Sequence, residues 1–145
     1  MVKLEINCDG GARGNPGPAG VGVVVKENHK DSVKLSKYIG PATNNQAEYT
    51  AVIEALKWLI ADRLSPSADN NIVADFYLDS QLVVEQLNGN YKIKHEGLKP
   101  LFNQIQELMS KIGGEITFTY IPREQNKAAD KLVNEAIDKE VSKNV

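Results

Sequence analysis

The chain has 145 residues, of which 41% are hydrophobic and 25% charged, so it is long enough for one domain (residues 1–145) and too apolar for a disordered chain. No apolar run approaches the roughly 20 residues that a membrane-spanning helix needs, and residues 1–3 lead into a strand pattern rather than a signal peptide. The net charge of −2 excludes binding to nucleic acid through overall positive charge. We therefore expect a cytoplasmic monomer that makes no membrane contact and meets any polyanion through a local patch or bound cations.

The expected elements begin with three alternating segments, which predict strands at residues 2–9, 20–27 and 32–39 with a hairpin tip at 28–31. Thr43 and Gln46 then form a T-x-x-Q capping box, which predicts a helix from there to about residue 63. The pattern continues with a loop at 65–71, a strand at 72–78, helices at 80–87 and 100–111, a strand at 115–121, and a helix at 126–139 with a frayed tail. This βββαβααβα order predicts an α/β domain in which helices pack on one mixed sheet.

Three aspartates stand at the ends of these elements. Asp9 follows the alternating apolar residues of the first strand and precedes a glycine-rich turn. Asp79 ends the fourth strand, where it could equally be the N-cap of the short helix that follows. Asp130 lies near the start of the last helix, where a solvated acid is also favoured by the helix dipole.

Glu48 is the most unusual acid, because it lies in the middle of the apolar stripe of its helix. The apolar residues at positions 52, 55 and 59 all lie within about 40° of it around the helix axis. Proximity to the helix N-terminus favours a glutamate at this point of the chain but does not explain why it faces inward. A carboxylate directed at the sheet is costly unless something pairs with it, which indicates a functional role.

Asp9, Glu48, Asp79 and Asp130 can converge on one rim if the first and fourth strands are neighbours. Clustered carboxylates repel one another, and a bound divalent metal ion is the usual solution. Ligands that are all oxygen, with no histidine or cysteine, favour Mg²⁺ or Mn²⁺ over zinc.

Four sequence blocks carry a family resemblance: "DGGARGNPGPAG", "TNNQAEYTAVIEAL", "LDSQLVVEQLNG" and "PREQNKAADKLVNEA". In order and spacing they resemble the motifs of type 1 ribonuclease H, and the match covers nearly the whole chain. The resemblance implies the ribonuclease H-like fold, a five-stranded mixed sheet of order 3-2-1-4-5 with helices on both faces. It implies that Asp9, Glu48, Asp79 and Asp130 bind two Mg²⁺ ions (Mn²⁺ being possible) and hydrolyse the RNA strand of RNA/DNA hybrids endonucleolytically, leaving 5′-phosphate and 3′-hydroxyl ends.

The resemblance also implies where the hybrid is contacted. We expect the small residues of the first turn to let backbone amides approach the substrate, and the second block to face the minor groove. A basic run after the short helix could grip phosphates, although it could also be a solvated loop. The expected substrate-binding residues are Gly10, Gly11, Ala12, Arg13, Asn15, Thr43, Asn44, Asn45, Gln46, Lys92 and Lys94.

The chain departs from the better-known family pattern in two places. The loop before the fourth carboxylate contains no histidine, and Arg123, Glu124 and Lys127 are the charged residues that stand there instead. The projecting helix rich in tryptophan and lysine is replaced by "NYKIKHEGLK". These departures predict modest turnover and affinity. The alternatives to a ribonuclease H are a non-catalytic hybrid-binding module, against which the four intact acids speak, and another nuclease of the same fold.

Overall fold

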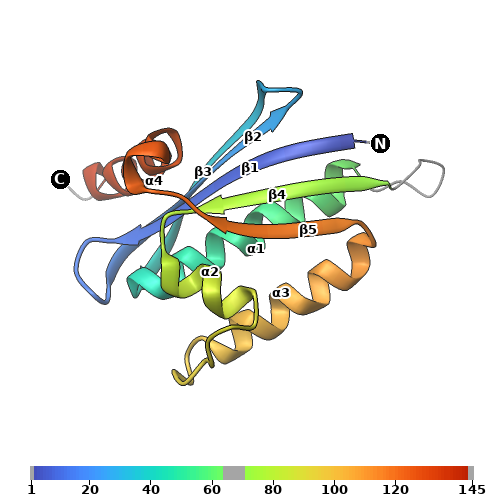
Figure 1. Ribbon diagram of the computed structural model, residues 1–145. Helices are drawn as coiled ribbons and strands as arrows, with labels where there is room; N and C mark the ends of the chain where they lie inside the picture. Colours follow the sequence, from blue (N-terminus) through green and yellow to red (C-terminus); the bar gives the residue numbers. More distant parts are fainter. Residues whose placement is uncertain (1, 64–70, 144–145) are drawn as a thin grey trace.

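The computed structural model describes residues 2–63 and 71–143, in which a twisted five-stranded sheet has the order β3-β2-β1-β4-β5 (Figure 1). Strand β2 pairs antiparallel with both β1 and β3, whereas β4 pairs parallel with β1 and β5 pairs parallel with β4. The elements are β1 (Val2–Ala12), β2 (Gly17–Glu27), β3 (Lys30–Ala42), α1 (Asn44–Arg63), β4 (Ile72–Leu78), α2 (Gln81–Leu87), α3 (Lys99–Ile112), β5 (Glu115–Tyr120), the 3-10 turn η1 (Arg123–Gln125) and α4 (Lys127–Ser142). The predicted fold, element order and sheet order are confirmed.

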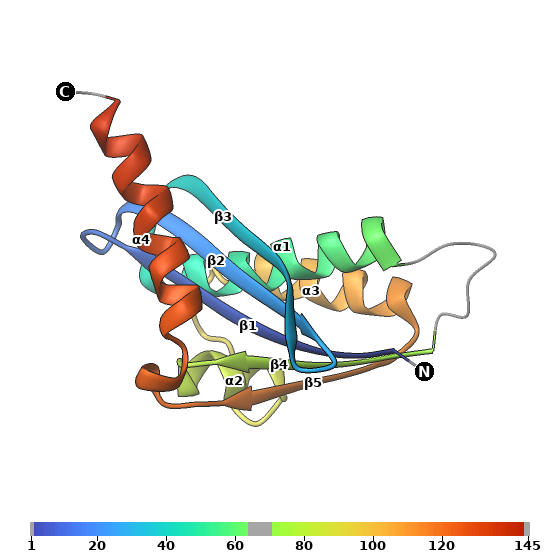
Figure 2. The same ribbon diagram turned by 90° about the horizontal axis from the view of Figure 1, so that it is seen from above.

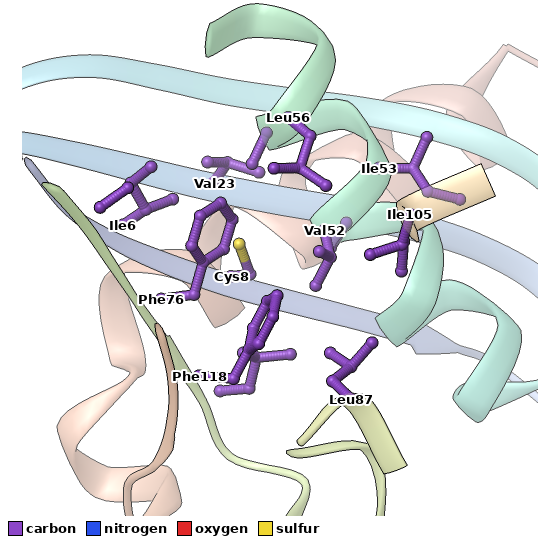
Figure 3. Packing of buried hydrophobic residues seen from close by; sticks show 14 of the residues in the cluster. Ile6, Cys8, Val23, Val52, Ile53, Leu56, Phe76, Leu87, Ile105 and Phe118 are labelled. Carbon is purple, nitrogen blue, oxygen red and sulfur yellow. The ribbon is translucent and has the colours of Figure 1, made fainter. Parts of the chain in front are cut away.

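Helices cover both faces of the sheet. Helices α1, α2 and α3 lie on one face, and α4 crosses the strands on the other face (Figures 1 and 2). The core lies under α1, where alternate residues of the strands meet apolar residues of the three helices (Figure 3). Phe76 and Phe118 pack there with ring centroids 5.3 Å apart. No helix within the described ranges is long and apolar enough to cross a membrane.

The first three strands are longer than predicted, because glycines do not interrupt backbone pairing in an antiparallel hairpin. Strand β1 continues through Asp9 to Ala12, with Gly10 opposite Val21. At Gly10 a Cβ atom would overlap the carbonyl group of Ala47 in α1. Glycine at this position therefore lets the start of α1 approach the end of β1 closely enough to form a site.

The hairpin tip and the end of the last helix also differ from the expectation. The hairpin tip is only Asn28 and His29, both with positive φ (54° and 65°), as two-residue turns between twisted strands require, and β3 already begins at residue 30. The frayed tail was wrong for residues 140–142, since α4 continues to Ser142, whose hydroxyl donates to the carbonyl of Lys139. Most of the predicted loop at 65–71 lies outside the described residues.

Candidate active site

Three carboxylates converge where β1, α1 and β4 meet. Asp9 lies on β1, Glu48 on α1, and Asp79 directly follows β4, which pairs in parallel with β1. One ligand oxygen of each lies within 4.8 Å of one oxygen of both others. The sequence-based expectation that these acids share one rim is therefore confirmed for these three residues.

Glu48 is buried, and its two oxygens have different surroundings. Oε1 accepts a hydrogen bond from the backbone N–H of Gly10 at 3.0 Å. Oε2 is buried with no hydrogen-bond partner among the described residues. Burial first, and then the neighbouring Asp9 carboxyl, raises the pKa of Glu48 well above its usual value. Helix α1 begins at Asn44 and has no acid in its first turn. Glu48 therefore lies beyond the first turn, and interaction with the helix N-terminus does not explain its presence.

Asp9 is also buried, with 7% of its surface exposed. Burial is the main cause that raises its pKa from 3.8 to about 7, and the charges of Asp79 and Asp130 add to the effect. Two adjacent, buried carboxyls whose pKa values are both raised resist carrying two negative charges together. A divalent cation would relieve this repulsion and would also give the unpartnered oxygen of Glu48 a ligand role, so the set fits a metal ion bound by oxygen atoms.

Asp79 is held by a residue that the sequence did not reveal. The N-cap of α2 is Ser80, whose hydroxyl accepts from the backbone N–H of Val83, so Asp79 is not the cap. Instead Asp79 accepts a hydrogen bond at 3.2 Å from the side-chain amide of Asn126. The same amide donates to the carbonyl of Cys8 at 2.9 Å. Asn126 is 1% exposed. Through these two hydrogen bonds it joins β1 and the end of β4 to the start of α4.

The sequence around Asn126 does not reveal this role. An asparagine just before a helix is typical of an N-cap, but no side-chain capping bond is present at the start of α4. Its amide oxygen accepts from Asn7 at 3.1 Å, which fixes the amide so that its NH₂ group faces Asp79. Such a long-range bond leaves no pattern in a single sequence.

Asp130, in the first turn of α4, lies beside this cluster but is not one of the three converging acids. It lines an open pocket of about 460 Å³ together with the other three carboxylates. The side-chain amide of Asn134 donates to the backbone carbonyl of Asp130 at 3.1 Å and lies 3.5 Å from its carboxylate. The fourth predicted acid therefore stands at the wall of the same pocket, less buried than Asp9 and Glu48.

Two arginines also line this pocket, Arg13 from the turn after β1 and Arg123 from the segment before α4. Burial raises the pKa of Asp79, whereas the hydrogen bond from Asn126 and the positive charge of Arg123 lower it. Of the three charged residues in the loop that lacks histidine, Arg123 lines the carboxylate pocket, and all three line a smaller pocket beside it.

The predicted substrate-binding residues divide into three groups. Those lining the carboxylate pocket are Gly10, Gly11, Ala12, Arg13, Asn44 and Asn45. Those whose side chains make local structure are Thr43 and Gln46, which form the predicted capping box, and Asn15, which accepts from the backbone N–H of Asn44 at 2.9 Å. Lys92 and Lys94 lie apart, in a second pocket of about 610 Å³ that also contains Asn45.

Comparison with known proteins gives a consistent result. The family model described as reverse transcriptase-like matches residues 7–136. A ribonuclease H of Ruthia magnifica subsp. Calyptogena magnifica is 32% identical over an alignment 152 residues long, gaps included, which covers 96% of this chain and 98% of that protein. A bifunctional protein of Mycobacterium tuberculosis is 43% identical over 139 residues, covering 94% of this chain but 36% of that protein, so the chain spans about a third of this relative. A crystal structure of LC11-RNase H1 in complex with an RNA/DNA hybrid matches with a TM-score of 0.86 at 42% identity, covering 95% of this chain and 99% of that one.

Proposed function

Because the chain belongs to the type 1 ribonuclease H family, we propose that it hydrolyses the RNA strand of RNA/DNA hybrids endonucleolytically and leaves 5′-phosphate and 3′-hydroxyl ends. The observation that carries this proposal is the convergence of Asp9, Glu48 and Asp79 within 4.8 Å at an open pocket. The related enzyme with a bound hybrid supports the choice of substrate.

Asp9, Glu48 and Asp79 would hold Mg²⁺, with Asp130 as a further ligand from α4 and Mn²⁺ as an alternative ion. Bound divalent ions supply a water that deprotonates readily and charge stabilisation for the phosphate oxygens. The buried oxygen of Glu48 that lacks a partner and the raised pKa values of Asp9 and Glu48 support this assignment. Asn126 would keep the Asp79 carboxylate directed at the ion through its bond at 3.2 Å.

We propose that the cut strand enters the carboxylate pocket and that the partner strand lies along the second pocket. Asn45 lines both pockets, so it stands where it can contact the minor groove between the two strands. Among the residues that the structure describes, the second pocket is lined by Lys92, Lys94 and His95 and by no carboxylate. Nδ1 of His95 accepts from the backbone N–H of Gly97, which leaves Nε2 as a donor. These donors suit the phosphates of a nucleic-acid backbone.

The deciding experiment presents end-labelled RNA/DNA, RNA/RNA and DNA/DNA duplexes to the protein with Mg²⁺, Mn²⁺ or EDTA. We expect internal cuts in the RNA strand of the hybrid alone, with either metal, and none in EDTA. Binding of the hybrid without any cut in either metal would favour a non-catalytic hybrid-binding module, and preferential cleavage of DNA/DNA would favour another nuclease of this fold. A cytoplasmic location, a monomeric state and the single domain over residues 1–145 stay predictions from the sequence.

A further inference from the structure

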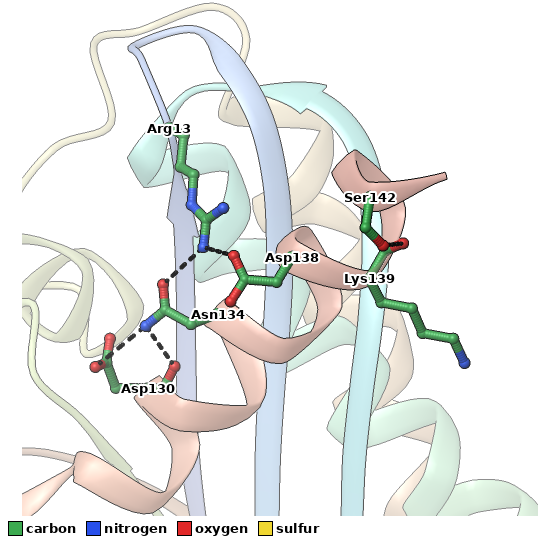
Figure 4. A network of polar contacts seen from close by, with 6 residues as sticks. All are labelled: Arg13, Asp130, Asn134, Asp138, Lys139 and Ser142. Atoms are coloured by element: carbon green, nitrogen blue, oxygen red, sulfur yellow. Dashed lines mark hydrogen bonds and ion pairs between the residues drawn. The ribbon is translucent and has the colours of Figure 1, made fainter. Parts of the chain in front are cut away.

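Arg13 does not extend freely into solvent from the turn after β1 (Figure 4). Its Nη2 atom lies 2.6 Å from Oδ1 of Asp138 and 3.4 Å from Oδ1 of Asn134, both on α4. Ion pairs such as Lys99–Glu96 and Lys143–Glu140 join residues three apart within one segment, whereas this pair joins the glycine-rich turn to the last helix. The contact therefore fixes the direction of a side chain that the turn alone would leave mobile.

The residues that receive Arg13 share one face of α4. Asp130, Asn134 and Asp138 follow one another at intervals of four, so their side chains lie above one another along the helix. The amide oxygen of Asn134 faces the Arg13 guanidinium, and its NH₂ group consequently faces Asp130 (Figure 4). A polar chain thus runs from Asp138 through Arg13 and Asn134 to the fourth carboxylate of the pocket.

The guanidinium keeps donors for a ligand. The contacts with Asp138 and Asn134 both use Nη2, which leaves the N–H groups of Nε and Nη1 as donors. The Arg13 side chain is 42% exposed while lining the carboxylate pocket. Beside four acids, an arginine that lines the pocket offers a phosphate positive charge and the free N–H groups of Nε and Nη1.

We propose that Arg13 binds a backbone phosphate of the RNA strand next to the cleaved bond, and that Asp138 is the positioning residue that holds the Arg13 guanidinium at the pocket. This inference rests on the proposed function, since it takes the strand in the carboxylate pocket to be RNA. Asp138 acts through Arg13 and touches neither substrate nor metal. Its loss removes the restraint on Arg13 and weakens hybrid binding, whereas the turnover at saturating substrate stays the same.

The test compares Asp138→Asn with Glu135→Gln. Both substitutions remove one negative charge from α4, and Glu135 is an exposed residue on the same helix with no recorded contact to Arg13. Removing either charge strengthens the general attraction for a polyanion, so the difference between the two variants isolates the positioning effect. Because an exposed ion pair contributes modestly, we expect KM for Asp138→Asn to exceed that of Glu135→Gln about two- to five-fold, with equal kcat.

The same pair of substitutions is then made in an Arg13→Gln protein, where the difference in KM between the two variants should disappear. In the protein that keeps Arg13, Asp138→Glu should have the same KM as wild type. A KM for Asp138→Asn equal to or below that of Glu135→Gln, or a difference that persists without Arg13, overturns the proposal. Hybrid affinity is measured in parallel by fluorescence anisotropy in an Asp79→Asn background. If the wild-type protein binds the hybrid without cutting it, the proposed function fails, while the affinity comparison still decides the role of Asp138.

Discussion

Replacing Asp9 by asparagine removes one charge from the buried carboxylate pair and should stabilise the metal-free protein at neutral and alkaline pH. Burial is the main reason that the pKa of Asp9 rises from 3.8 to about 7 in the folded state. Between these two values the folded protein keeps a proton that the unfolded chain releases, so the free energy of unfolding falls as pH rises through this window. Above about pH 7 the whole penalty is present.

The magnitude follows from the shift. A rise of about three pKa units corresponds to about 4 kcal/mol at about 1.4 kcal/mol per unit. An asparagine at this buried position still has polar atoms to satisfy, which costs about 2 kcal/mol. The net gain for Asp9→Asn is thus about 2 kcal/mol at pH 8, or about 6 °C in Tm for a chain of this length.

The assay is thermal unfolding in EDTA at pH 8 and at pH 4. The control is Asp31→Asn, which replaces an exposed acid on β3. We expect Asp9→Asn to melt about 6 °C above wild type at pH 8 and at or below wild type at pH 4, where the wild-type carboxyl is already protonated. The control should change little at either pH. A Tm for Asp9→Asn below wild type at pH 8, or a gain that is the same at both pH values, would refute the reasoning.

Three other variants test the surroundings of the site. Replacing both Lys92 and Lys94 by glutamine should raise KM, flatten its dependence on salt and leave kcat unchanged. An unaltered KM and salt slope would indicate that these lysines lie in a solvated loop that does not bind the hybrid. Asn126→Ala should destabilise the protein by about 1–3 kcal/mol, because the carbonyl of Cys8 loses its buried donor, and should lower kcat as Asp79 loses its orientation; a wild-type Tm and kcat would contradict this. Arg123→Gln removes a charge that lowers the pKa of Asp79, so the acidic limb of the pH profile of kcat/KM should move to higher pH, and an unmoved limb would exclude this role.

The sequence predicted the parts of the site that depend on periodicity. Glu48 could be directed at the sheet from the 3.6-residue period alone, and it is buried as expected. Asp9 and Asp79 could be placed at strand ends, and the parallel pairing of β1 with β4 brings those ends together. The capping box at Thr43 and Gln46 is reproduced by both of its hydrogen bonds.

The remaining contacts could not be predicted, because they join residues that only the folded chain brings together. From the sequence alone, the side chains of Asn126 and Arg13 could bind any of several partners. Which partner each one binds depends on how α4 lies against β1 and β2. That approach is close: a Cβ atom on Gly22 of β2 would overlap the carbonyl group of Ala129 in α4. In the sequence Gly22 is only a glycine within an apolar strand.

Cleavage of an end-labelled RNA/DNA hybrid by Asp79→Asn protein in saturating Mg²⁺ tests the carboxylate site most directly. Asp79 is half-buried, and its substitution removes a carboxylate oxygen that we propose as a metal ligand without opening a cavity in the core. We expect turnover to fall at least about a hundred-fold, while the Tm in EDTA equals or exceeds that of wild type. Turnover close to that of wild type, from a protein with an unchanged Tm, would contradict the assignment of this cluster as the site of RNA hydrolysis.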